Sequence, residues 1–505
     1  MTSPLQPKPT DPADFGAAEA RALIARKQLS PVELADACIR RVEQVDHAVN
    51  ALVARDFEDL NTNSKAAEAA VMRGDNLGLL HGLPIGIKDM IDVKGLPTTY
   101  GSLIFRDNIA AQDDPMVTGL RAAGAMPMGK TNNPEWSAGA NTVNRVYGAT
   151  ANPHDLTRSS AGSSGGSAAA LACGMMPLAS GSDLGGSLRN PAAFCGVVGY
   201  RPSFGVVPGP ARPMALLPLS TVGPMARSVK DASLLLSVMA RADNRDPFTA
   251  VVDGKTTWSP SSFAHLPPCD LSSLKMAATE DFGFAPTEGM IRKHFASILP
   301  KITPFFARTE MTSPDCTGAD RIFSVLRAIG FVGTHAKFLD EQPDLVGENV
   351  AQNVREGRSY TADDIAQALV MHGGYQRAWN AFFAQHDYLL TPAVTISPRD
   401  WHELYPTQID GVATKSYYHW LGLAYASTLA GHPSITIPCG RDANGMPFGL
   451  QIIGQRNNDL GVLSVAAEIE ALIAGTPDLA VSGPDIQTLR NAPPLRDAPG
   501  FLTVG

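Results

Sequence analysis

The spacing of apolar residues near the start of the chain is that of a helix. Ser30, Pro31 and Glu33 stand in the order of a capping box, with proline at the first helical position. Apolar side chains then recur every three or four positions, at Leu34, Ala37, Cys38, Val42 and Val45. The sequence therefore predicts an amphipathic helix over residues 31–45.

Beyond residue 81 the pattern changes to short apolar runs separated by Gly, Pro, Asn and Ser. Such runs predict buried strands, and their alternation with helical stretches such as 225–240 is typical of an α/β fold. The predicted strands are 83–88, 124–129, 174–179, 196–200, 387–394 and a hairpin, 433–440 with 447–454, around Asp442–Gly445. Residues 246–275 predict a polar excursion, and 276–380 predict mainly helices.

Composition narrows the class of protein. The chain has 505 residues, 44% of them apolar and 18% charged, which is enough to bury a large core. A net charge of −8 without a basic, aromatic-rich run argues against a nucleic-acid partner. The Pro-rich residues 1–13 predict a loose arm. Because no signal peptide or apolar run of about 18 residues appears, we expect a cytoplasmic protein without a membrane partner. Six scattered cysteines predict free thiols.

One stretch matches the nucleotide-binding pattern G-x-x-x-x-G-K-T, from Gly124 to Thr131. A phosphate loop needs free backbone N–H groups and a helix that begins at its Lys-Thr pair. Here Pro127 has no N–H to donate, and Pro134 disfavours helical geometry at Asn133. The stretch therefore predicts a strand that ends in a turn, with Lys130 capping it or forming an ion pair.

Two Gly/Ser clusters, 162–167 and 181–187, flank a predicted Ala-rich helix and a short apolar strand. The first contains G-x-S-x-G, but a polar loop precedes it where a nucleophile elbow needs a strand. In the second, Ser187 precedes a helix start predicted at Asn190-Pro191, and Gly196 is predicted to end that helix. Successive N–H groups at 184–187 could converge as an oxyanion hole. No His, Cys or carboxylate spacing predicts a metal site.

These segments resemble the amidase signature family. The resemblance is densest over 162–205, and it extends to HGLPIGIKD at 81–89, GAMPMGKTNNPEWSAG at 124–139, LSTVGPMARSVKDA at 219–232 and residues 429–470. It implies a single α/β domain, here 14–505, with a large mixed sheet between helices. Residues 246–380, where the resemblance is weak, would cover the substrate mouth.

The resemblance also implies the site residues. Ser187 is the expected nucleophile, Ser163 the bridging serine that follows a cis peptide bond, and Lys88 the base. Backbone amides of Leu184, Gly185, Gly186 and Ser187 would form the oxyanion hole. Trp136, Ser137, Ala138, Gly139 and Ala140 would lie near the acyl pocket. The aromatic content of 416–426 suits either the other side of this pocket or a helix packed against the core. Ala161 departs from the glycine common in the family, with a local effect expected.

The residue types suit this chemistry. A serine hydroxyl needs an adjacent base, and lysine can serve only when it is neutral. Its ordinary pKa of about 10.4 falls on burial, and Ile85 and Ile87 flank Lys88 in a predicted buried strand. Asp183 and Arg189 are predicted to form an ion pair that braces the loop carrying Ser187, called the serine loop below.

The resulting hypothesis is an amidase that cleaves a small-molecule carboxamide without metal or cofactor. A homodimer is a possible assembly state. Three alternatives remain: the glutamine-hydrolysing subunit of a tRNA-dependent amidotransferase, a nucleotide-binding protein using 124–131, and a non-catalytic scaffold. The S-T-V-G-P-M-A-R stretch at 220–227 favours a stand-alone amidase over the amidotransferase component.

Overall fold

The apolar runs of the sequence form strands of one mixed sheet in the computed structural model, which describes residues 11–502. The sheet has 11 strands, in the order β1 (Leu52–Arg55), β3 (Met126–Thr131), β2 (Pro84–Lys88), β8 (Leu178–Asp183), β10 (Thr221–Ala226), β9 (Val198–Arg201), β18 (Ser434–Arg441), β19 (Pro447–Gly454), β15 (Tyr388–Pro392), β13 (Lys275–Ala278) and β14 (Arg308–Met311). β2 pairs in parallel with β3 and β8, and β13 pairs in parallel with β14 and β15. The remaining pairs are antiparallel.

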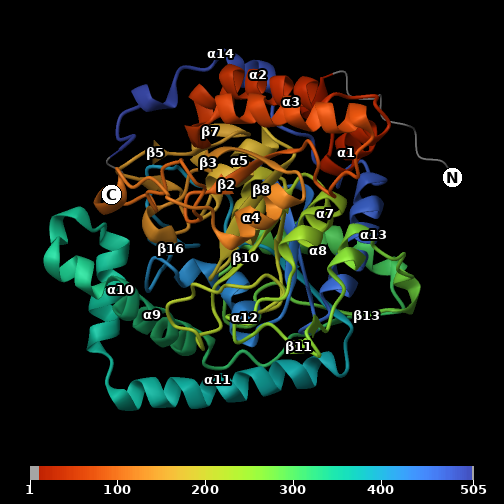
Figure 1. The fold of residues 1–505 in the computed structure, drawn as a ribbon. Coiled ribbons are helices and arrows are strands. Elements are labelled where there is room, and N and C mark those ends of the chain that lie inside the picture. The colour runs from red at the N-terminus through yellow and green to blue at the C-terminus, as the bar shows by residue number, and fades with distance from the viewer. Residues whose placement is uncertain (1–10, 503–505) are drawn as a thin grey trace.

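Helices cover this sheet on both sides (Figure 1). They are α1 (Ala17–Ala25), α2 (Pro31–Val49), α3 (Phe57–Arg73), α4 (Pro115–Ala122), α5 (Gly165–Ala172), α6 (Arg189–Cys195), α7 (Val229–Met239), α8 (Gly289–Ile302), α9 (Ala319–Glu341), α10 (Glu348–Ser359), α11 (Ala362–Phe383), α12 (Gly422–Ala430), α13 (Asp459–Ala474) and α14 (Ile486–Asn491). In Figure 1, α2 and α3 lie at the top of the molecule, α10 and α9 lie at the lower left, and α11 runs along the bottom. The predicted α/β fold with a central mixed sheet between helices is confirmed.

Four short hairpins complete the strands. They pair β4 (Val143–Asn144) with β5 (Gly148–Ala149), β6 (Ala151–Asn152) with β7 (Asp155–Ser159), β11 (Val251–Val252) with β12 (Lys255–Thr256), and β16 (Gln408–Ile409) with β17 (Val412–Ala413). The β11–β12 hairpin lies in the predicted polar excursion. Within 276–380 the structure has the strands β13 and β14 as well as the predicted helices.

Most predicted elements are found, with shifted ends. The helix predicted over 31–45 is α2, and its capping box is formed as expected. The strand predicted at 174–179 begins only at Leu178, because the chain leaves α5 through Gly174 in the left-handed region, with φ of 69°. The helix predicted at 225–240 begins at Val229, since Met225 and Ala226 belong to β10. The β18–β19 hairpin is confirmed, and the cysteines are free as predicted.

Residues 1–10 of the predicted arm lie outside the described residues. The adjoining Pro12–Asp14 form a 3-10 turn against α2, where Asp11 and Asp14 make ion pairs with Arg41. Within 11–502, α9 is long and apolar enough to span a bilayer, which the search for uninterrupted apolar runs did not predict. It packs against α10, α11 and α12, so it forms part of this domain.

The capping box of α2 leads to a stability prediction. Ser30 Oγ accepts the Val32 N–H at 2.9 Å, and Glu33 accepts the Ser30 N–H at 2.9 Å. Ser30→Ala should lower the free energy of unfolding by about 1 kcal/mol, because the Val32 N–H loses its acceptor. Urea unfolding of both proteins measures the change. Ser30→Thr, which keeps the hydroxyl, is the control, and an equal loss in the two variants would contradict the capping role.

Candidate active site

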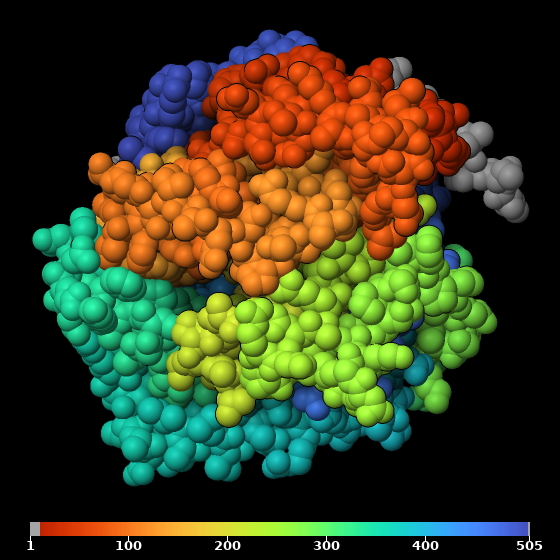
Figure 2. Space-filling view, in the orientation of Figure 1, coloured from red at the N-terminus to blue at the C-terminus, as the bar shows by residue number. Residues whose placement is uncertain are grey.

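A cavity of about 110 Å³ opens at the carboxyl end of β8. Its walls come from segments far apart in the sequence: Met90, Trp136, Ser137, Gly139, Ser163, Ser182, Leu184, Gly185, Ser187, Ser220, Arg327, Phe331, Tyr417 and Leu421. Figure 2 shows the surface hollowed where its orange, teal and yellow-green parts meet, and these parts of the chain also supply walls of the cavity. The expected nucleophile and bridging serine therefore lie in the same cavity.

Lys88 ends β2 and points its ammonium group at serine hydroxyls. Its Nζ donates to Ser163 Oγ at 2.6 Å, to Ser164 Oγ at 3.0 Å and to Ser182 Oγ at 3.0 Å. The backbone places these groups together, because β2 runs parallel to β8 and the Lys88 N–H donates to Ser180 Oγ of β8. Lys88 thus has hydroxyl partners where an ordinary buried lysine would have a carboxylate.

The surroundings favour the neutral amine. Lys88 is fully buried. Burial lowers the pKa of Lys88 to about 7, although the nearby charge of Asp183 raises it. A substantial fraction of the amine is therefore unprotonated at neutral pH and able to accept a proton. The predicted depression of the lysine pKa agrees in direction with this value.

Ser163 follows a cis peptide bond from Gly162, as the family resemblance implied. Ala161, two residues before Ser163, has φ of 59°, in the left-handed region that favours glycine. Ser163 is fully buried and Ser187 partly buried. Among the described residues no hydrogen bond joins Ser163 to the Ser187 hydroxyl, although the Ser164 N–H donates to the Ser187 carbonyl at 3.2 Å.

Three of the four expected oxyanion-hole amides have no acceptor within the described chain. The N–H groups of Leu184, Gly185 and Ser187 donate to no described residue. Gly186 corrects the expectation, because its N–H donates to Asp183 Oδ1 at 2.9 Å. An N–H committed to that carboxylate holds the loop in place and already has its acceptor. Among the described residues, the amides of Leu184, Gly185 and Ser187 are therefore the donors of this turn that remain free.

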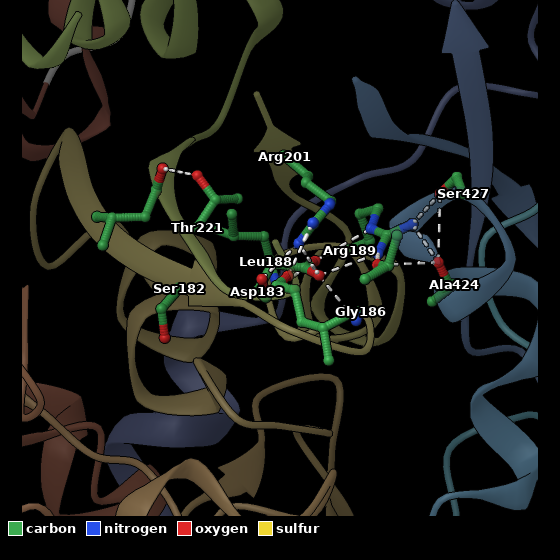
Figure 3. A network of polar contacts seen from close by, with 12 residues as sticks. Ser182, Asp183, Gly186, Leu188, Arg189, Arg201, Thr221, Ala424 and Ser427 are labelled. Carbon is green, nitrogen blue, oxygen red and sulfur yellow. Dashed lines mark hydrogen bonds and ion pairs between the residues drawn. The ribbon is translucent and has the colours of Figure 1, made fainter. Parts of the chain in front are cut away.

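Asp183 holds the serine loop through two buried arginines (Figure 3). Arg189 makes a two-pronged contact with it, Nε to Oδ2 at 3.0 Å and Nη2 to Oδ1 at 2.9 Å, and Arg201 Nη1 lies 3.1 Å from Oδ1. Burial would raise the pKa of Asp183, but the two guanidiniums outweigh it and hold the pKa well below its usual range. The predicted Asp183–Arg189 pair is confirmed, and Arg201 is an addition.

The same carboxylate explains where α6 begins. The sequence predicted a start at Asn190-Pro191, whereas the helix begins at Arg189. Asp183 Oδ2 accepts the Leu188 N–H at 3.1 Å, so the carboxylate at the end of β8, five residues earlier, satisfies a donor at the start of the helix. Gly196 ends α6 with φ of 66°, as predicted.

The phosphate-loop pattern forms the strand β3, as predicted. Lys130 is buried, and its Nζ lies 3.1 Å from Asp89 Oδ1 and 2.8 Å from Thr98 Oγ1. The Thr131 hydroxyl contacts Ser167 at 2.7 Å. The lysine and threonine that a nucleotide would need are therefore engaged inside the core, which argues against the nucleotide-binding alternative.

Of the five residues expected near the acyl pocket, three line the cavity and two lie behind its wall. Trp136, Ser137 and Gly139 line the cavity. Ala138 corrects the expectation because it packs into an apolar cluster with Val350 and Val354. Ala140 also lies behind the wall, with its backbone against Gly162. From 416–426, Tyr417 and Leu421 line the cavity.

Several lining residues were missed by the sequence analysis: Met90, Ser182, Ser220, Arg327 and Phe331. Ser182 could have been found, because it lies two residues after Ser180 in β8 and so points to the same face of the strand. Arg327 and Phe331 lie on α9, in the region where the resemblance is weak. Their spacing of four residues puts them on one helix face, but nothing in the sequence says which face meets the cavity.

Comparisons with known proteins agree with this fold. The family model Amidase matches residues 33–264 and 293–463. An acylamidase from Rhodococcus erythropolis is 33% identical over 462 residues, which are 91% of this chain and 95% of that protein. A glutamyl-tRNA(Gln) amidotransferase component from Synechococcus elongatus is 31% identical over 90% of this chain and 96% of its own length. The crystal structure of a bacterial aryl acylamidase of the amidase signature family superposes with a TM-score of 0.84 at 27% identity, covering 95% of this chain and 99% of that one.

The chain belongs to the amidase family, the amidase signature enzymes. It is an amide hydrolase that acts on carbon–nitrogen bonds.

The Asp183 cluster leads to a second stability prediction. Asp183→Asn should lower the free energy of unfolding by about 3–5 kcal/mol, because Arg189 and Arg201 would stay buried without a counter-charge. Denaturant unfolding, or the yield of folded protein if the loss is complete, measures this.

The matched control is Asp75→Asn, which removes the exposed ion pair with Arg73. That change should cost less than about 1 kcal/mol. Similar losses in the two variants would mean that the buried cluster does not hold the loop.

Proposed function

We propose that this amidase cleaves a small-molecule carboxamide through an acyl-enzyme on Ser187, with Ser163 as proton relay and Lys88 as base. The observation that carries the proposal is the 2.6 Å contact between Lys88 Nζ and Ser163 Oγ at the wall of the cavity that Ser187 also lines. A base with a pKa of about 7 and a hydroxyl beside it match what serine activation requires.

In the first half-reaction Ser187 Oγ attacks the amide carbon and passes its proton to Ser163, whose own proton moves to neutral Lys88. The C–N bond then breaks while the nitrogen takes a proton back through the same relay. Ammonia or an amine leaves, and the acyl group remains as an ester on Ser187. In the second half-reaction water loses a proton to the relay and attacks this ester, which releases the carboxylate and restores Ser187.

The amides of Leu184, Gly185 and Ser187 would stabilise the oxygen that becomes negative in each tetrahedral intermediate. These donors belong to a turn held by Asp183, so little reorganisation is needed when the charge develops. Their freedom from acceptors within the described chain supports this role. The relay needs Ser163 and Ser187 to come within hydrogen-bond distance, and such contacts tighten when substrate binds.

A second candidate function is the glutamine-hydrolysing component of a tRNA-dependent amidotransferase. It is supported by the similarity to components of glutamyl-tRNA(Gln) amidotransferases. The sequence at 220–227 favours the stand-alone amidase instead. Turnover of simple amides by the purified chain alone would favour the first function, and turnover only after addition of the amidotransferase partner proteins would favour the second.

The nucleophile assignment predicts that Ser187→Ala loses activity by about a thousandfold or more, because the atom that forms the acyl-enzyme is removed. Amide turnover and labelling by a fluorophosphonate probe measure the loss. Ser261→Ala, at an exposed serine, is the matched control and should keep both. Continued labelling of the folded Ser187→Ala protein would assign the nucleophile to another serine.

The base assignment predicts the pH dependence. Lys88 must be neutral to accept a proton, so kcat/KM should rise about tenfold per pH unit below pH 7 and flatten above it, giving an alkaline optimum. Lys88→Arg should lose most activity, since a guanidinium stays protonated in this range. Lys65→Arg, at an exposed lysine, should keep the wild-type profile. An active Lys88→Arg protein with an unchanged profile would place the base elsewhere.

A further inference from the structure

Arg327 is a buried cation in the wall of the cavity, and aromatic rings surround it. It projects from α9 and is 6% exposed. Its guanidinium carbon lies 4.9 Å from the ring centres of Phe331 and Tyr417, 5.3 Å from that of Tyr418 and 5.9 Å from that of Phe323. Rings stabilise a guanidinium through its faces, whereas its N–H donors point outward in its plane. This packing leaves the donors to find partners of their own.

Those donors have no partner in the described chain. The Arg327 guanidinium makes no hydrogen bond or ion pair with any residue of 11–502, and its Nε is buried without an acceptor. Glu356 is a nearby negative charge, but its Oε1 accepts hydrogen bonds from Tyr360 at 2.7 Å and Tyr418 at 2.8 Å. Arg189 and Arg201, the other large buried cations near the site, both contact Asp183. Arg327 therefore differs from them in lacking a carboxylate.

The guanidinium is charged when substrate arrives. Desolvation lowers the pKa of Arg327 to about 10, an effect that Tyr418 and Glu356 partly offset, so the group stays protonated at neutral pH. A buried charge without a partner is unfavourable, and a carboxylate is the planar anion that matches the two-pronged donor edge of arginine. Since the cavity also contains Ser187 and Ser163, an anion bound by Arg327 would be part of the same molecule as the scissile amide.

We propose that Arg327 binds a carboxylate on the substrate, so that the enzyme prefers amides whose acyl part ends in a carboxylate. The inference rests on the proposed function of the Ser187 cavity and names its substrate class. Phe331 and Tyr417, which hold the guanidinium, also line the cavity and would contact the hydrocarbon between carboxylate and amide. An acyl chain spanning from Arg327 to Ser187 would be fixed at both ends.

A matched substrate series tests the proposal on the wild-type enzyme. Succinamate, glutaramate and adipamate each carry one amide and one carboxylate, and succinamide, glutaramide and adipamide are their neutral counterparts of equal shape. We expect kcat/KM to favour the anionic member by about 10- to 100-fold for at least one chain length. Hydrolysis of the diamides with no preference for any anionic partner would overturn the carboxylate site while leaving amide hydrolysis intact.

Substitutions of Arg327 test whether this residue causes the preference for anionic substrates. Arg327→Met should bring the anionic-to-neutral ratio down to about one or below, and Arg327→Lys should keep only part of it, because an ammonium lacks the planar fork. Arg355→Met, which removes an exposed arginine paired with Glu348 on α10, is the matched control and should keep the wild-type ratio. A ratio that survives in folded Arg327→Met would also overturn the proposal.

A binding measurement separates this inference from the catalytic one. If none of the amides is turned over, the proposed function fails, and calorimetry of succinate, glutarate and adipate with the Ser187→Ala protein then decides on Arg327. Binding that disappears in Ser187→Ala/Arg327→Met would support a carboxylate site. Absence of binding in Ser187→Ala, or equal binding by the double variant, would overturn it.

Discussion

The buried ion pairs of Asp183 with Arg189 and Arg201 are the interaction on which the site depends. Asp183 is the last residue of β8, Arg189 belongs to α6, and Arg201 ends β9. Arg189 also reaches Ala424 and Ser427 of α12 and Gln451 of β19. One carboxylate thus ties β8 to α6 and to β9, which lies on the other side of β10 in the sheet. The Asp183 carboxylate also accepts the N–H groups of Gly186 and Leu188, so these ion pairs and hydrogen bonds together fix the conformation of the serine loop.

Two buried lysines on neighbouring parallel strands show how surroundings decide chemistry. Lys88 of β2 and Lys130 of β3 are both fully buried, and burial lowers the pKa of each. Asp89 opposes the shift at Lys130 through an ion pair, whereas Lys88 has only hydroxyl partners and a more distant charge at Asp183. Lys130 is therefore suited to stabilising the core, and Lys88 to exchanging a proton. The fold supplies the same strand geometry to both, and a single neighbouring carboxylate separates their roles.

The sequence was sufficient where local physics decides the outcome. The capping box at Ser30, the hairpin around Asp442–Gly445 and the left-handed Gly196 depend on neighbouring residues, and each was predicted correctly. The start of α6 and the use of the Gly186 N–H were predicted wrongly, because a carboxylate at the end of β8 supplies the acceptor. Arg327 was not found at all. Its role in the cavity wall depends on which face of α9 meets residues 417–421, and that is a matter of tertiary packing.

The residues that line the cavity are held in place by two different parts of the structure, and this affects which lining residues can be substituted. The part of the wall with Ser163, Ser182 and Ser187 rests on the sheet and the Asp183 ion pairs, where a displaced group would disturb buried charges. A second part of the wall is formed by Arg327 and Phe331 of α9 together with Tyr417 and Leu421, which lie outside the central sheet. Under the proposed function, substitutions in that second part of the wall would change which acyl group fits, while the Asp183 contacts keep the serine-bearing part in place. Hydrolysis and substrate selection would then rest on separate parts of the structure.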